Sequence, residues 1–114
     1  MSDCIFCKVI SGEISSEIVH EGKEVVAFRD INPVAPTHVQ VVPRRHVARI
    51  ADFDPGTDTP WLVEMFQVAN QVAHAEGLDR GYRLVLNNGA LAGQSVLHVH
   101  LHVVGGRQLG WPPG

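Results

Sequence analysis

Apolar and polar residues alternate along residues 96–104, near the end of the chain. Because successive side chains of a β-strand point to opposite faces, this alternation predicts a strand with one apolar face and one histidine face. The histidines on that face are His98, His100 and His102. A buried imidazole without a hydrogen-bond partner costs about 1 to 3 kcal/mol. We therefore expect the histidine face to line a functional site.

Apolar residues at three- and four-residue spacing predict one long helix in the middle of the chain. Thr59 is the expected cap, Pro60 the first helical residue, and Gly77 the end of the helix. The apolar stripe of this helix comprises Trp61, Leu62, Met65, Phe66, Ala69, Val72 and Ala73. A short helix is expected to begin at an Asp3 cap and to run through Ile10.

Four further segments have the composition of β-strands. They are residues 17–20, 24–29, 38–43 and 82–87. The first two flank Glu21-Gly22-Lys23 and are expected to form a hairpin. Together with the histidine strand, the elements predict an α+β fold with a mainly antiparallel sheet of about five strands, one long helix and one short helix.

The composition is that of one globular domain spanning residues 1–114. Of the 114 residues, 45% are hydrophobic and 18% are charged, which suits a single packed core. The start of the chain does not resemble a signal peptide, and no apolar run is long enough to span a membrane. We expect a cytoplasmic protein that binds neither membranes nor nucleic acid.

Charge is distributed unevenly along the chain. Acidic residues end at Asp79, so Arg80, Arg83 and Arg107 give the last 35 residues a charge of +3. The preceding residues carry six basic and twelve acidic side chains. A site built from the acid-free end would favour a ligand that carries phosphate.

The segment before the histidine strand, residues 87–95, is rich in small residues and in amide and hydroxyl groups. Glycines there allow backbone N–H groups to approach a ligand closely, so the segment is expected to cradle an oxyanion. It has neither the lysine of a P-loop nor a G-x-G-x-x-G pattern. Beside such a cradle, the three histidines could either chelate a metal or supply a nucleophile.

The segment His98-Val-His-Leu-His102-Val-Val matches the histidine triad signature, in which histidines alternate with apolar residues. The other segments that carry the likeness are residues 30–38, 42–46, 81–83, 93–96 and 105–114, which end in Trp-Pro-Pro-Gly. Over nearly its whole length, the chain resembles the Hint branch of the histidine triad (HIT) superfamily. The resemblance implies a HIT-like fold, a homodimer, and hydrolysis of the P–N bond of purine nucleoside 5′-monophosphoramidates.

The resemblance also implies catalytic roles. His100 would attack phosphorus and form a nucleotidyl-histidine, which water then hydrolyses without any cofactor. His38 and His102 would contact the phosphate oxygens or orient His100. Gln94 and Ser95 would stabilise developing charge and meet the leaving amine.

Substrate-binding residues follow from the same resemblance. Asp30 would bind the ribose hydroxyls, Asn87 and Gly93 would hold phosphate, and Trp111 would reach the neighbouring subunit's site. The base pocket would comprise Ile5, Phe6, Ile14 and Ile31. Ordinary core packing explains the first three equally well, whereas Ile31 lies beside Asp30 in a loop, where functional residues are common. Gln40, in an otherwise apolar strand, departs from the Hint pattern.

Cys4 and Cys7 form a C-x₂-C pair, which in a reducing compartment indicates a metal site or two inert cysteines rather than a disulfide. Some histidine triad relatives bind a structural zinc with such a pair, and here the two remaining ligands would be His46 and His98. Two thiolates and two imidazoles suit a closed tetrahedral zinc site. The alternative is two unreactive cysteines on a buried helix face, with His46 at the surface.

Three other functions remain open. A dinucleoside polyphosphate hydrolase of the same superfamily would use the same nucleophile. A metal-dependent enzyme could use the triad histidines as ligands and would then lose activity on chelation. A nucleotide-binding or scaffold protein would bind without turnover.

Overall fold

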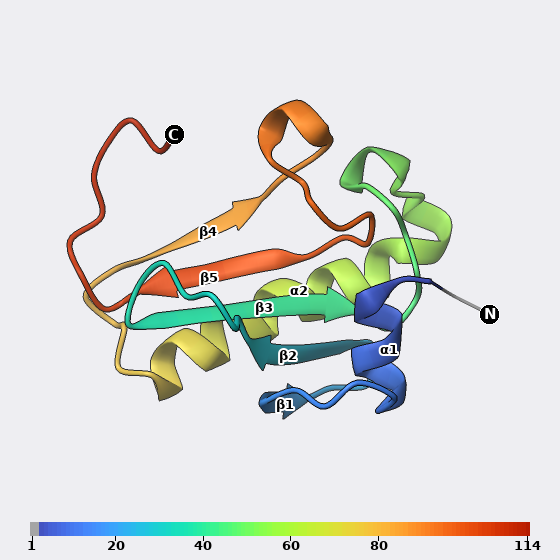
Figure 1. Ribbon diagram of the computed structural model, residues 1–114, viewed down its shortest axis with the longest axis horizontal. Helices are drawn as coiled ribbons and strands as arrows, with labels where there is room; N and C mark the ends of the chain where they lie inside the picture. Colours follow the sequence, from blue (N-terminus) through green and yellow to red (C-terminus); the bar gives the residue numbers. More distant parts are fainter. Residues whose placement is uncertain (1–2) are drawn as a thin grey trace.

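The computed structural model describes residues 3–114 and confirms the α+β architecture (Figure 1). The helices are α1 (Ile5–Ser11) and α2 (Pro55–Ala75). The strands are β1 (Ile18–Glu21), β2 (Val25–Arg29), β3 (Thr37–Pro43), β4 (Tyr82–Leu86) and β5 (Leu101–Gly105). They form one antiparallel sheet in the order β1-β2-β3-β5-β4, which places β3 and β5 at the centre.

The sheet separates two apolar cores. In Figure 1 the long helix α2 runs behind the sheet, whereas α1 lies in front, at one end of the central strands. The core on the α2 side includes Val25, Ala27, Val39, Val41, Trp61, Met65, Val99, Leu101 and Val103. The smaller core beside α1 comprises Phe6, Val9, Val26, Phe28 and Val42. Alternate residues of β2 and β3 therefore fill opposite cores.

Both helices begin elsewhere than the sequence pattern predicts. Cys4, not Asp3, caps α1, because the Cys4 Sγ accepts a hydrogen bond from the Cys7 N–H at 3.4 Å. Helix α2 begins at Pro55, where the Asp54 carboxylate accepts from Gly56 N at 3.1 Å. An Asp-Pro pair forms the same cap as the expected Thr-Pro pair five residues later, so the helix continues through Pro60.

The apolar stripe of α2 is also shifted. Val68 is buried in the core, whereas Phe66, which was expected there, is 41% exposed. The end of the helix agrees with the prediction, since Gly77 adopts a φ of +75°, which glycine tolerates without steric cost. None of the helices within residues 3–114 is long and apolar enough to cross a membrane.

The last strand is shorter than predicted, because regular pairing starts only at Leu101. The pairing of Val41 with Leu101 would continue to Pro43 opposite Val99, and proline has no N–H to donate. Val99 N instead donates to Val47 O at 2.8 Å. The alternation nevertheless holds, since Val99 packs in the α2 core while His98 and His100 contact Phe6 in the other core.

Candidate active site and metal centre

Two cysteines, one at the cap and one in the first turn of α1, form a compact cluster with two histidines from distant loops. The Sγ of Cys4 lies 3.3 Å from His98 Nδ1, and the Sγ of Cys7 lies 3.5 Å from His46 Nδ1 and 3.6 Å from His98 Nδ1. The two imidazole Nδ1 atoms are 3.1 Å apart. All four candidate ligand atoms lie within 4.8 Å of one another.

These separations fit zinc. With metal bonds of about 2.3 Å to sulfur and about 2.0 Å to nitrogen, a tetrahedral site separates sulfur from nitrogen by about 3.5 Å and two nitrogens by about 3.3 Å. The observed distances lie within a few tenths of an ångström of these values. Cys4, Cys7, His46 and His98 therefore form a site that could bind a structural zinc ion, in agreement with the sequence-based prediction.

The tautomer of His98 suits this role. Its Nε2 lies 2.8 Å from the carbonyl oxygen of Pro43, which can only accept, so Nε2 carries the proton and Nδ1 presents a lone pair to the cluster. Burial, the largest cause, lowers the pKa of His98 to about 4. The imidazole is therefore neutral at physiological pH, which is the form that binds metal.

His100 has the opposite tautomer to His98. Its Nδ1 donates to the carbonyl oxygen of His98 at 2.7 Å, so the lone pair of the neutral ring is on Nε2. The side chain is buried, and this burial lowers the pKa of His100 below its usual value, against the effect of the hydrogen bond to His98. The site thus holds a neutral imidazole with a fixed tautomer, as a histidine nucleophile requires.

His38 and His102 form a directed hydrogen-bond chain. Val34 N donates to His38 Nδ1 at 3.2 Å, so the proton of the neutral His38 ring is on Nε2, 2.9 Å from His102 Nδ1. His102 therefore carries its own proton on Nε2. Burial, followed by the charges of neighbouring histidines, lowers the pKa of His102 to about 4.

This chain argues against a second metal site. Asp30, His38 and His102 lie close enough to share an ion. However, the Val34 N–H occupies the lone pair of His38 at Nδ1, and Nε2 bears the proton. A neutral His38 consequently has no ring nitrogen free to bind a metal there. The cluster is better described as a proton-ordered network next to the buried His100.

Asp30 is held at both oxygens. Asn32 N donates to Oδ1 at 2.8 Å, and Gln40 Nε2 donates to Oδ2 at 2.6 Å. The same Oδ2 lies 3.4 Å from His38 Nε2. This places the carboxylate expected to bind ribose directly beside the histidine network, with lone pairs left for a ligand.

The segment after β4 is organised by Gln94. Its Nε2 donates to Ala48 O at 2.7 Å and to Val96 O at 3.0 Å, and its Oε1 accepts from Gly89 N at 2.8 Å. The Gln94 side chain therefore uses its donors inside the loop. Its neighbour Ser95 is exposed.

The remaining expected phosphate contacts lie in the same segment. Gly93 is exposed and has a φ of +92°, a conformation that favours glycine, while Asn87 is half-buried at the end of β4. Direct contact of these two residues with a ligand stays a prediction.

The apolar residues expected in a base pocket divide into two groups. Phe6 is buried and packs edge-on against His98, His100 and Phe28, so it forms a wall of the site from within the core. Ile31 is 89% exposed and therefore is not part of either core. The other exposed members of the expected binding set are Ile5, Ile14 and Trp111. Their exposure leaves them available to a ligand or to a second chain.

An ion pair between the exposed Arg45 and the buried Asp58, which no periodic sequence pattern indicated, anchors the loop carrying His46. Asp58 accepts from Trp61 Nε1 at 2.8 Å, and Arg45 Nε lies 3.1 Å from the same carboxylate oxygen. Burial alone would raise the pKa of Asp58, but hydrogen bonds from Asp54 N and Trp61 and the charge of Arg45 hold it below its usual value. The sequence did carry one sign of this arrangement, because an acidic residue three positions before a tryptophan in the first helical turns can accept from the indole N–H.

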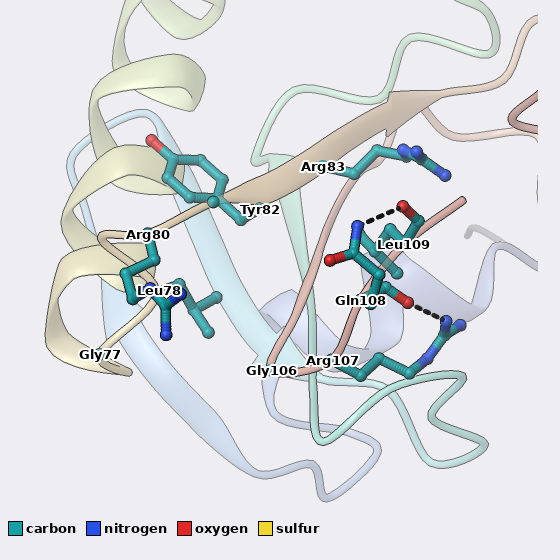
Figure 2. Close-up of a pocket in the computed structure, with 10 residues that line it drawn as sticks. Gly77, Leu78, Arg80, Tyr82, Arg83, Gly106, Arg107, Gln108 and Leu109 are labelled. Atoms are coloured by element: carbon teal, nitrogen blue, oxygen red, sulfur yellow. Dashed lines mark hydrogen bonds between the residues drawn. The ribbon is translucent and has the colours of Figure 1, made fainter. Parts of the chain in front are cut away.

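A separate cavity of about 540 Å³ lies between the end of α2, β4 and the segment after β5 (Figure 2). Arg80, Arg83 and Arg107 line it, but Figure 2 shows Arg80 on the opposite side from the other two. Arg83 donates to Gly110 O at 2.6 Å, and Arg107 donates to Val34 O. These guanidinium groups thus brace the C-terminal segment and do not converge on a common point.

Comparison with known proteins agrees with this geometry. A "14 kDa zinc-binding protein" of Zea mays is 45% identical over 115 residues, covering 99% of this chain and 89% of the relative. A crystal structure described as a HIT family hydrolase, from Legionella pneumophila Philadelphia 1, matches with a TM-score of 0.95 and 48% identity, covering 98% of this chain and all of the other.

A histidine triad nucleotide-binding protein from Candida albicans matches with a TM-score of 0.83 and 33% identity, over 96% of this chain and 83% of that one. The family model of the HIT domain matches residues 11–109, which include the histidine network and two of the four candidate metal ligands, His46 and His98. The chain therefore belongs to the HIT domain family.

Proposed function

We propose that this protein is a Hint-type hydrolase that cleaves the P–N bond of purine nucleoside 5′-monophosphoramidates through a covalent intermediate on His100. The observation that supports it best is the hydrogen bond from His100 Nδ1 to His98 O, which leaves a nucleophilic lone pair on Nε2. Membership of the HIT family and similarity to a structure described as a HIT family hydrolase agree with this chemistry.

In the proposed first step, His100 Nε2 attacks the α-phosphorus. A new P–N bond forms to the imidazole, the P–N bond to the substrate amine breaks, and the amine leaves after taking up a proton from solvent. The positive charge that develops on the ring is stabilised by the His98 carbonyl at Nδ1. His102 Nε2–H donates to a phosphoryl oxygen and opposes the negative charge that develops there.

In the second step, water attacks the same phosphorus. The bond between phosphorus and His100 Nε2 breaks and the attacking water gives up a proton to solvent, which releases the nucleoside monophosphate and regenerates the neutral imidazole. Asp30 binds the ribose, and the exposed Ile31 beside it contacts the purine. Zinc held by Cys4, Cys7, His46 and His98 has a structural role, and the protein acts as a homodimer.

The proposal is tested by quenching the enzyme during turnover of an adenosine 5′-phosphoramidate and measuring its mass. We expect an adenylyl adduct on His100, and we expect His100→Ala to bind AMP but to lose turnover. His74→Ala is the matched control, since His74 is exposed and pairs only with Asp79 among the contacts described. Full activity of His100→Ala would refute the mechanism.

A second candidate is a nucleotide-binding protein without catalytic activity, favoured by the name of the maize relative, which refers to zinc binding alone. The same assay separates the two, because a binding protein would retain AMP without forming an adduct. A diadenosine polyphosphate is assayed in parallel, and preferential cleavage of this substrate would assign the other hydrolase activity of the superfamily.

A further inference from the structure

Gln40 is a polar side chain at the centre of the sheet. It lies in β3, paired with Phe28 on β2 and with His102 on β5, and the residue is only 8% exposed. The neighbouring strand positions Val39, Val41 and Val42 are fully buried apolar residues. A glutamine in this environment loses contact with water and must find hydrogen bonds within the protein or from a ligand.

Only the nitrogen of its carboxamide has a hydrogen-bond partner. Nε2 donates to Asp30 Oδ2 at 2.6 Å, whereas Oε1 is buried and has no hydrogen-bond partner among residues 3–114. The orientation is not interchangeable, because the ionised Asp30 carboxylate can only accept and so requires the amide nitrogen. A buried acceptor without a donor is unfavourable in the free protein, and such groups in native structures call for an explanation.

A ligand bound at the Asp30 carboxylate, which Gln40 contacts, could supply the donor that Gln40 Oε1 lacks. In the proposed function, on which this inference rests, Asp30 binds the ribose of the substrate. A ribose presents two vicinal hydroxyl donors, and Asp30 already accepts from Asn32 N and from Gln40 Nε2. A second acceptor beside the carboxylate would allow each hydroxyl to donate to a separate group.

We propose that Gln40 is a specificity-determining residue that selects ribonucleotides, because its Oε1 accepts one hydroxyl of the ribose while Asp30 accepts the other. The terminal torsion of glutamine is broad, so a partial turn of the carboxamide would present Oε1 to the ligand while Nε2 stays on Asp30. An apolar residue at this position would offer no acceptor, and Asp30 would then bind the sugar alone.

The test is calorimetric binding of AMP, 2′-deoxy-AMP and 3′-deoxy-AMP to the zinc-loaded protein. In the wild type we expect removal of either hydroxyl to weaken binding by about tenfold, the equivalent of one hydrogen bond. In Gln40→Leu we expect one of these two losses to disappear while the other remains. AMP itself should bind about tenfold more weakly to this variant.

The pattern separates direct from indirect action. If both losses disappear in Gln40→Leu, Gln40 acts only by positioning Asp30, and the proposal is overturned. If all three nucleotides weaken equally, Gln40 contacts the base or supports the fold, which also overturns it. Unchanged affinities have the same consequence.

Two further variants keep the result interpretable. Gln40→Met preserves side-chain length and should behave as Gln40→Leu does. Each variant removes the unsatisfied Oε1 but also the hydrogen bond from Nε2 to Asp30, so we expect both to fold with an unfolding temperature close to that of the wild type. Gln71→Leu, on the exposed side of α2, makes the same chemical change away from the site and should match the wild type. Absence of AMP binding to the wild type would refute the proposed function itself.

Discussion

His98, His100 and His102 occupy alternate positions of one segment, yet each ring offers a different hydrogen-bonding group to its surroundings. The carbonyl of Pro43 leaves His98 with a lone pair on Nδ1, and the carbonyl of His98 leaves His100 with one on Nε2. The hydrogen bond from His38 leaves His102 with a donor. The role of each imidazole is thus set by one backbone or side-chain contact rather than by its place in the repeat.

The first prediction concerns Gln94 and stability. Replacing Gln94 with Ala leaves Gly89 N, Ala48 O and Val96 O without their partner, and we expect a loss of about 2 kcal/mol in the free energy of unfolding. Ser95→Ala removes an exposed hydroxyl and should leave stability unchanged. Urea unfolding of both variants provides the measurement, and equal stability of Gln94→Ala and wild type would contradict the assigned loop role.

At the level of single residues, the sequence predicted which side chains gather but not how they bond. The C-x₂-C pair, His46 and His98 indicated their cluster through spacing and resemblance. By contrast, the engagement of Gln94 and the orphaned oxygen of Gln40 depend on loops that meet only in the folded chain. The Asp58 and Arg45 pair was missed for the same reason, since 13 positions separate two residues that no periodic pattern links.

Among the elements, the short helix α1 has a disproportionate role. It has seven residues and is too short to be stable alone, but its cap, Cys4, and its first turn, with Cys7, supply two of the four candidate metal ligands. Its helical geometry brings the Cys4 and Cys7 sulfurs to one face. A metal at this point would fasten α1 to the loops before and after the central strands.

The second prediction separates metal binding from helix capping. We expect about one zinc per chain in the wild type and a loss of zinc, with a lower unfolding temperature, in Cys4→Ser. Serine is itself a good helix cap, so the effect reports the ligand rather than the cap. Elemental analysis and thermal unfolding test this, with exposed Asp3→Asn as the control. Wild-type protein that contains no zinc when it is prepared without chelator would refute the zinc assignment.

The third prediction concerns the pair that joins β2 to the end of α2. Arg29 contacts both oxygens of Glu76 at 3.0 and 2.9 Å, and this interaction lowers the pKa of Glu76 below its ordinary value of 4.5. A lowered pKa means that the stabilisation is complete above pH 4.5 and is lost as the pH falls through the pKa of the folded state. We expect Glu76→Gln to cost about 1 to 2 kcal/mol at pH 7.

This difference between Glu76→Gln and the wild type should shrink as the pH is lowered below 4.5, because the wild-type carboxylate is then protonated as well. Denaturant unfolding at a series of pH values provides the test. Glu13→Gln serves as the control, since Glu13 makes only a long, exposed contact of 4.0 Å with Lys8. A difference that is independent of pH would show that the ion pair is not its cause.

Most elements could be predicted, because each depends on a local pattern. Their ends could not, since they depend on tertiary partners. Pro43 lies in the neighbouring strand β3 and ends the regular pairing of β5. The sequence offers two equally good caps for α2, Asp54 and Thr59, and the fold uses Asp54. Phe66 illustrates the limit best, because its spacing suits the core while the fold leaves it at the surface.

For the molecule as a whole, β4 forms one edge of the sheet and β1 the other (Figure 1), and two apolar side chains of α2 are exposed. Val63 is 51% exposed and Phe66 is 41% exposed. An unpaired strand edge and exposed apolar side chains are features that a second copy of the chain could cover. They agree with the proposed homodimer, in which Trp111 reaches the neighbouring site.

The fourth prediction tests this assembly. Sedimentation equilibrium at micromolar concentration should give the mass of two chains, and Phe66→Glu should shift the protein towards a single chain by placing a charge in the apolar contact. Leu91→Glu makes the same change at a fully exposed leucine on the 3₁₀ turn Ala90–Ala92 and should not alter the mass. A wild-type protein that sediments as one chain would refute the dimer.

His98 has a consequence for how preparations of this protein behave. Its side chain faces the candidate metal ligands while its carbonyl oxygen holds the ring of His100. Since one residue would both ligate the ion and position His100, we expect loss of the ion to loosen the orientation of His100 while every other side chain of the site is retained. A sample with incomplete metal content would then resemble a mixture of active and silent molecules, and its specific activity would serve as a measure of zinc occupancy.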